Sequence, residues 1–159
     1  MFLFGKKKAQ PKLYAPLNGE YMPIKKVPDP VFSDKILGDG VAVLPTDGNV
    51  LAPCDGEITN VAETLHAYGI QTPDGLELLI HIGLNTVELK GEGFTPLVKV
   101  GDKVKKGDPL CKVDLELIKS KGYPLYTPLL ITNSDDLKSM TGHYAAGTAG
   151  ETVVVEYVK

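Results

Sequence analysis

Cysteine is scarce in this sequence, and long apolar runs are missing. The two cysteines among 159 residues, Cys54 and Cys111, lie far apart without metal-type spacing. The sequence therefore predicts reduced thiols in a cytoplasmic protein rather than a disulfide framework. No apolar run approaches the roughly 20 residues that cross a bilayer as a helix. A net charge of −3 also lacks the excess of basic residues that a large nucleic-acid interface needs.

The first residues differ in composition from the rest of the chain. Residues 2–4 are apolar and three lysines follow them, which reverses the charge order of a secretory signal peptide. Such a segment makes at most a weak contact with a membrane surface, because it is too short to bind well alone. We therefore expect residues 1–16 to form a flexible N-terminal segment and residues 17–159 to form one domain.

Glycine and proline punctuate the rest of the chain. The 17 glycines and 12 prolines separate short runs rich in valine, isoleucine and leucine, a pattern typical of short strands joined by turns. The clearest predicted strands are residues 41–44, 56–61, 67–72, 76–82, 110–113 and 152–157. Helical patterns are confined to residues 115–121 and 134–140. The sequence thus predicts an all-β fold, an antiparallel β-sandwich or distorted barrel with one or two short helical turns.

A weak internal repeat fits this class. Residues 100–110 read VGDKVKKGDPL, in which two Gly-Asp pairs lie six residues apart. The pattern is also seen in biotinyl and lipoyl carrier domains, although Gly-Asp pairs occur wherever tight turns are needed. The repeat indicates a barrel–sandwich hybrid with a duplicated hybrid motif. It does not indicate a lipoyl-type carrier, because the hairpin tip at residues 73–75 has no lysine to modify.

Two of the three histidines flank one predicted hairpin. If Thr72 and Gly75 enclose a two-residue turn, counting outward along both strands places His66 directly opposite His81, on the same face of the sheet. Alternation along residues 76–82 puts His81 outward, because the other side of that strand is entirely apolar and must face the core.

The same count places His66 on the outward side together with Tyr68 and Ile70. Two imidazoles in an apolar surface patch suggest a docking site. Two alternatives stay open at this point. The histidines could be surface residues without a function, or His66 and His81 could bind zinc, for which no third ligand is evident.

The sequence around His81 resembles a known family. Residues 78–94 read LLIHIGLNTVELKGEGF, which is similar to the signature of the glucose-type enzyme IIA of the bacterial phosphoenolpyruvate:sugar phosphotransferase system. Further segments resemble that family in the expected order: GE at 19–20, VPDPVFSDKILGDG at 27–40, APCDG at 52–56, TLHA at 64–67 and TPLLITN at 127–133. The resemblance covers roughly residues 17–158 and implies a free-standing β-sandwich phosphocarrier.

The resemblance also implies residue roles. His81 would accept a phosphoryl group on Nε2 from phospho-HPr and pass it to a cysteine of an enzyme IIB domain. A backbone carbonyl such as that of Gly83 would hold the proton on Nδ1. His66 would stabilise the transferred group. From strand alternation rather than from the resemblance, we expect Thr64 on the same strand and face as His66, where it would orient the His66 ring. No cofactor is required, although a regulatory zinc is compatible. The alternative function is a regulatory module whose phosphorylation state sets its binding to transporters or kinases.

Partner-binding residues are expected around the histidine pair. An apolar rim would exclude water, and an acidic edge would attract basic partners. Asn85 stands where many family members carry aspartate, so its contact with the partner should differ. The predicted partner-binding residues are Phe32, Ile36, Leu79, Val87, Asp29 and Asn85.

Overall fold

The computed structural model describes residues 11–159, which are mostly strands. The strands are β1 (Lys12–Tyr14), β2 (Gly19–Pro23), β3 (Asp39–Pro45), β4 (Asn49–Leu51), β5 (Gly56–Val61), β6 (Ala67–Gln71), β7 (Glu77–His81), β8 (Phe94–Pro96), β9 (Lys103–Val104), β10 (Pro109–Val113), β11 (Thr127–Ile131), β12 (Ser139–Gly142), β13 (Ala146–Gly147) and β14 (Val153–Val158). The α-helices are α1 (Pro30–Ser33) and α2 (Leu115–Ser120), and the 3₁₀ turns are η1 (Ile24–Lys26), η2 (Thr86–Leu89) and η3 (Ser134–Asp136).

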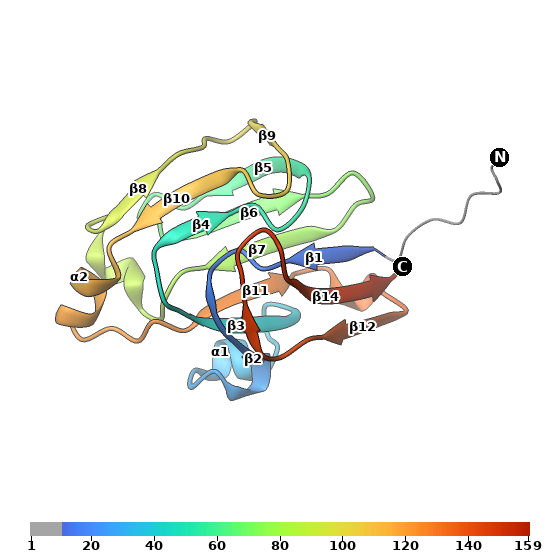
Figure 1. Ribbon diagram of the computed structural model, residues 1–159, viewed down its shortest axis with the longest axis horizontal. Coiled ribbons are helices and arrows are strands. Elements are labelled where there is room, and N and C mark those ends of the chain that lie inside the picture. The colour runs from blue at the N-terminus through green and yellow to red at the C-terminus, as the bar shows by residue number, and fades with distance from the viewer. Residues whose placement is uncertain (1–10) are drawn as a thin grey trace.

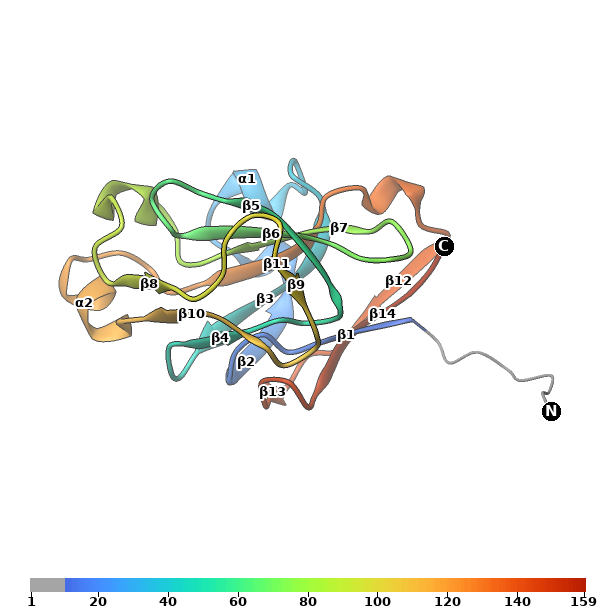
Figure 2. The same cartoon turned by 90° about the horizontal axis from the view of Figure 1, so that it is seen from above.

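The strands of residues 11–159 form three antiparallel sheets (Figures 1 and 2). The largest has eight strands in the order β13-β2-β3-β11-β7-β6-β5-β9. Two smaller sheets, β1-β14-β12 and β4-β10-β8, complete the sandwich. The all-β prediction is therefore confirmed. None of the helices in this part of the chain has the length and apolar character needed to span a bilayer.

Alternation along the strands of the large sheet creates two separate hydrophobic clusters. Val41 and Val43 of β3 point inward and join the main core, to which all three sheets contribute. Ala42, between them, points to the other face and joins a smaller cluster that includes Phe32 of α1. The smaller cluster consists of Ile24, Val27, Phe32, Ala42, Leu84 and Leu130, with Met22, Leu79 and Tyr126 packed against it. The segment with η1 and α1 thus covers part of the outer face of the large sheet.

The Gly-Asp repeat is a repeated turn. In residues 99–102 and again in 105–108, the amide of the first lysine donates to the aspartate carboxylate three residues later, at 3.0 and 2.9 Å. The glycine amides then donate to the carbonyls of Ile58 and Ala52, at 2.8 and 2.9 Å. The two halves of the repeat therefore anchor their connections to the sandwich in the same way, as tight-turn chemistry predicts.

The predicted start of the domain is wrong. Residues 12–14 form β1, which pairs with β14, and Leu13 and Ala15 are fully buried. The domain therefore begins before residue 17, because β1 pairs with β14 and its neighbouring side chains lie in the main core. The predicted flexibility of residues 1–10, and the membrane contact of residues 1–8, lie outside the described residues.

The two predicted helices had different outcomes. Residues 115–121 contain α2, which Asp114 caps by accepting a hydrogen bond from the Leu117 amide at 3.1 Å. The helix predicted at 134–140 is only the single turn η3, which covers Ser134–Asp136. The chain then enters β12, because residues 139–142 pair with β14 across the smaller sheet.

Candidate functional site

The β6–β7 hairpin carries both histidines, but its register differs from the predicted one. A three-residue loop joins the strands, since the Thr72 amide donates to the Leu76 carbonyl at 2.9 Å. Gly75 completes this loop with φ at 94°, a conformation that glycine adopts without strain. The extra loop residue shifts the pairing by one, so that Ala67, and not His66, lies opposite His81.

The shift reverses the predicted faces of β6. Tyr68 pairs with Ile80 and Ile70 pairs with Leu78, so both β6 side chains lie in the main core and are almost fully buried. Their predicted place in an outward patch is therefore wrong. Alternation along β7 was predicted correctly, because Ile80 faces the core while His81 stays partly exposed on the outer face.

His66 meets His81 despite the shifted register. Their ring centroids lie 4.8 Å apart with the planes at 84°, an edge-to-face arrangement. His66 precedes the first residue of β6 and follows Leu65, whose φ of 63° is unusual for a leucine. The chain turns sharply there, so the alternation of the strand does not decide where the His66 ring points. The contact between the two histidines was predicted, but for the wrong geometric reason.

Each imidazole has a hydrogen-bonding partner at Nδ1. His81 Nδ1 lies 2.9 Å from the Gly83 carbonyl, which can only accept, so Nδ1 carries the proton and Nε2 presents a lone pair. His66 Nδ1 lies 2.7 Å from the Thr64 hydroxyl. When this hydroxyl donates, His66 carries its proton on Nε2 and can donate it to a neighbouring group. Thr64 belongs to the turn between β5 and β6 and not to a strand.

Burial keeps both histidines neutral near pH 7. Burial, together with the nearby His81, lowers the pKa of His66 to about 4. Burial also lowers the pKa of His81, although the hydrogen bond to Gly83 and the charge of Asp29 oppose this effect. A neutral His81 with a free Nε2 is a nucleophile, and an adjacent neutral His66 is a hydrogen-bond donor without a repelling charge.

The structure relates three of the six predicted partner-binding residues, Phe32, Leu79 and Asp29, to the surroundings of His81. The buried Phe32 ring lies 4.9 Å from the His81 ring, centroid to centroid. Leu79 packs against the smaller cluster that contains Phe32. Asp29 caps α1 by accepting from the Val31 amide, and its charge acts on His81. Asn85, with φ at 61°, immediately precedes η2.

Two further predicted partner-binding residues are exposed apolar side chains. Ile36 is 67% exposed and Val87 is 46% exposed, which suits contact with another protein. Val31 and Leu37 are also exposed apolar residues of the segment around α1, and they were not among the predicted partner-binding residues. The signal for the first was present, because Asp29-Pro30 is a typical helix start that would have placed Val31 on a short surface helix.

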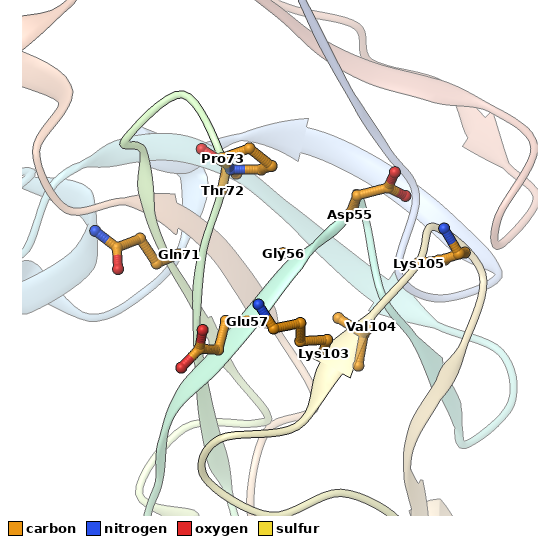
Figure 3. Close-up of a pocket in the computed structure, with 9 residues that line it drawn as sticks. All are labelled: Asp55, Gly56, Glu57, Gln71, Thr72, Pro73, Lys103, Val104 and Lys105. Atoms are coloured by element: carbon orange, nitrogen blue, oxygen red, sulfur yellow. The ribbon is translucent and has the colours of Figure 1, made fainter.

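Two further features to weigh against the histidine site are possible metal ligands and a surface cavity. Within residues 11–159 no group of three His, Cys, Asp or Glu side chains could hold a metal ion, and the zinc hypothesis for His66 and His81 stays a prediction. A cavity of about 400 Å³ lies between β5, β9 and the turn at the far end of β6, and polar side chains including Glu57, Gln71 and Lys103 line it (Figure 3).

Two neutral imidazoles in contact on the outer face of a β-sandwich, beside the buried Phe32 ring, fit a protein that receives a group from the surface of another protein. The comparisons with known proteins agree. Residues 11–137 match the model of the family described as phosphoenolpyruvate-dependent sugar phosphotransferase system, EIIA 1. The chain belongs to this family, and its role is that of a phosphocarrier.

Similar proteins support the assignment over nearly the whole chain. The glucose-specific EIIA component of Halalkalibacterium halodurans is 55% identical over 144 residues, which cover 90% of this chain and 83% of that protein. The corresponding component of Staphylococcus epidermidis is 47% identical over 158 residues, 97% of this chain and 95% of that protein. The solved structure of glucose permease IIA from Mycoplasma capricolum superposes with a TM-score of 0.87 at 34% identity, covering 97% and 99% of the two chains.

Proposed function

We propose that this protein accepts a phosphoryl group on Nε2 of His81 from phospho-HPr and passes it to a cysteine of an enzyme IIB domain. The single observation that carries the proposal is the contact between His81, with its proton held on Nδ1, and the neutral His66. Family membership supplies the reaction, and these two rings supply a nucleophile and a donor for it. The regulatory and zinc-binding alternatives have no such support from the relatives.

The reaction is two successive transfers between nitrogen and sulfur nucleophiles. In the first, the His81 Nε2 lone pair forms a P–N bond while the P–N bond of phospho-HPr breaks. In the second, a cysteine thiolate of the acceptor forms a P–S bond while the His81 P–N bond breaks. Transition states of this kind are loose, so positioning and charge stabilisation account for most of the rate. The proton on His81 Nδ1 stays in place throughout.

The neighbours of His81 divide the remaining work. His66 Nε2–H donates to an oxygen of the phosphoryl group, and Thr64 keeps His66 in the tautomer that can do so. The Phe32 ring beside His81 and the exposed apolar side chains around it exclude water from the transfer, which protects the phosphohistidine from hydrolysis. Asp29 contributes negative charge, which speeds encounter with a basic partner surface.

We further infer a glucose permease as the acceptor and the cytoplasm as the compartment. The relatives named above carry glucose in their names, which supports glucose as the sugar. Cys54 and Cys111 are both free thiols, which agrees with a reducing compartment.

Reconstitution tests this function directly. The purified protein is mixed with phosphoenolpyruvate, enzyme I and HPr, and ³¹P–¹⁵N NMR and peptide mapping locate the phosphate. We expect one phosphate on His81 Nε2, and we expect it to chase onto an added glucose-type IIB domain. Phosphate on another residue, or none, would contradict the assignment to His81. Transfer to a IIB domain for another sugar, but not to the glucose-type domain, would contradict only the sugar.

A further inference from the structure

One short backbone segment contacts both histidines. The Ile82 amide donates to the His66 carbonyl at 2.7 Å. The next residue, Gly83, accepts the hydrogen bond from His81 Nδ1 through its own carbonyl. The peptide group before Ile82 therefore holds the backbone of His66, and the peptide group after Gly83 holds the proton on His81 Nδ1. The conformation of residues 82 and 83 sets both at once.

Gly83 does not fix this orientation itself. Its φ is 76°, which glycine reaches easily, but glycine also reaches many other conformations at little cost. Neighbouring groups must therefore hold the carbonyl toward His81. One lies before β11 and one at its start: the Leu84 amide donates to the Pro124 carbonyl at 3.1 Å, and the Gly83 amide makes a long contact of 3.4 Å with the hydroxyl of Thr127, the first residue of β11.

Thr86 makes the closest contacts with this segment. Its hydroxyl donates a short hydrogen bond to the Ile82 carbonyl, and the residue is fully buried. Its methyl group lies against Gly83, since a Cβ built on Gly83 would come within 2.6 Å of Thr86 Cγ2. Removing the hydroxyl would leave the buried Ile82 carbonyl without this donor. Because an unpaired buried carbonyl costs free energy, the Ile82–Gly83 peptide would be favoured to rotate toward another donor.

We propose that Thr86 is a positioning residue for phosphoryl transfer: it aims the Gly83 carbonyl at His81 Nδ1 and so keeps Nε2 deprotonated. The inference rests on the proposed function of His81. Thr86 never touches the phosphoryl group. It acts on the backbone before the Gly83 carbonyl: its hydroxyl binds the Ile82 carbonyl, and its methyl lies where a side chain on Gly83 would point.

Three variants test the proposal. Thr86→Val keeps the shape and removes the hydroxyl, and Thr86→Ser keeps the hydroxyl and removes the methyl. The matched control is Thr72→Val, which removes another buried hydroxyl at the other end of the same hairpin, where Thr72 contacts Asp74 and the Leu76 amide. The readouts are the ¹⁵N chemical shifts of His81, which report the tautomer in the unphosphorylated protein, and the kinetics of labelling by phospho-HPr.

We expect Thr86→Val to convert His81 from one tautomer to a mixture and to lower kcat about tenfold, roughly the contribution of one hydrogen bond, with KM for phospho-HPr unchanged. Thr86→Ser should keep the wild-type tautomer and most of kcat, and Thr72→Val should keep both. If Thr86→Val does not fold, Thr86→Ala is measured in its place against Thr86→Ser.

Two results would overturn the role of Thr86. One is a folded Thr86→Val or Thr86→Ala protein with the wild-type His81 tautomer. The other is an equal loss in Thr72→Val, which would indicate a general effect of destabilisation. The tautomer is read without any phosphoryl transfer. Failure of wild-type protein to be labelled on His81 would therefore refute the proposed function and leave the tautomer result to be judged on its own.

Discussion

The two ends of the β6–β7 hairpin hold their titratable groups in opposite ways. At the turn, Asp74 interacts with the Thr72 hydroxyl and accepts from Tyr157 of β14, and Lys159 binds its carbonyl. Burial raises the pKa of Asp74, but the hydrogen bonds from Thr72 and Tyr157 and the charge of Lys159 outweigh it and leave that pKa below its usual value. The Asp74 carboxylate thus has partners for its charge, and its contacts with Tyr157 and Lys159 hold the hairpin against the sheet that contains β14.

At the other end, the titratable groups are kept neutral instead. His66 and His81 contact each other and Phe32, and burial lowers the pKa of both imidazoles. Each ring has one fixed partner at Nδ1, and His81 Nε2 keeps a free lone pair. The comparison teaches that the same hairpin is stabilised where its polar groups are fully paired and is reactive where one of them is left unpaired.

The largest expected effect is at the reactive end. His81→Ala should abolish labelling by phospho-HPr, because the chain then lacks the nucleophile. Acid-labile incorporation of ³²P measures this, and unchanged circular dichroism confirms that the variant is folded. Labelling that persists at the wild-type level would place the acceptor elsewhere.

His66→Gln should separate the two transfers. Phosphorylation of His81 is expected to survive, because the nucleophile and its Gly83 contact remain. Onward transfer to the IIB cysteine should fall on the order of 10²- to 10³-fold, the size seen when a donor to a developing charge is removed. Rapid-quench measurement of each half-reaction checks this, and wild-type rates in both would remove His66 from the mechanism.

Acid should lower the free energy of unfolding in a defined pH window, because His66 at the reactive end is neutral in the folded protein. Because the His66 pKa is lowered to about 4 in the folded protein, against about 6.5 unfolded, the unfolded chain binds more protons between these values. Stability should therefore fall as the pH drops from about 6.5 to 4, by about 2 kcal/mol once solvent screening is allowed for. Urea unfolding across this range measures it. His66→Gln should flatten the curve, and an unchanged slope would refute the shifted pKa.

The smallest effect is expected at the turn. Tyr157→Phe removes a part-buried hydrogen bond to the Asp74 carboxylate and should lower the free energy of unfolding by about 1–2 kcal/mol. Labelling of His81 should keep its wild-type rate, because the substitution lies at the far end of the hairpin. Thermal unfolding and the labelling assay are run on the same sample. A slower labelling rate would mean that the two ends are coupled.

Much of the site could be inferred from particular residues before any coordinates. The alternation along residues 76–82 correctly put His81 outward, because one side of that strand is wholly apolar. The predicted register of the β6–β7 pair was wrong by one residue. Thr72-Pro73-Asp74-Gly75 suits a two-residue turn, but the chain forms a three-residue loop. Turn signals alone do not separate these cases, since the choice depends on the pairing of Thr72 with Leu76 across the loop.

Short-range residue preferences were sufficient for strands β3, β5, β6, β7, β10 and β14, the repeated Gly-Asp turns and the outward side of β7, because alternation and turn chemistry act over a few neighbouring residues. The place of the His66 ring and the partners of the Gly83 and Leu84 amides were decided by the folded chain. They depend on a leucine held at positive φ and on Thr127 and Pro124, which lie about 40 residues further along the chain. Such positions follow from the sum of long-range contacts, and no local pattern in the sequence encodes them.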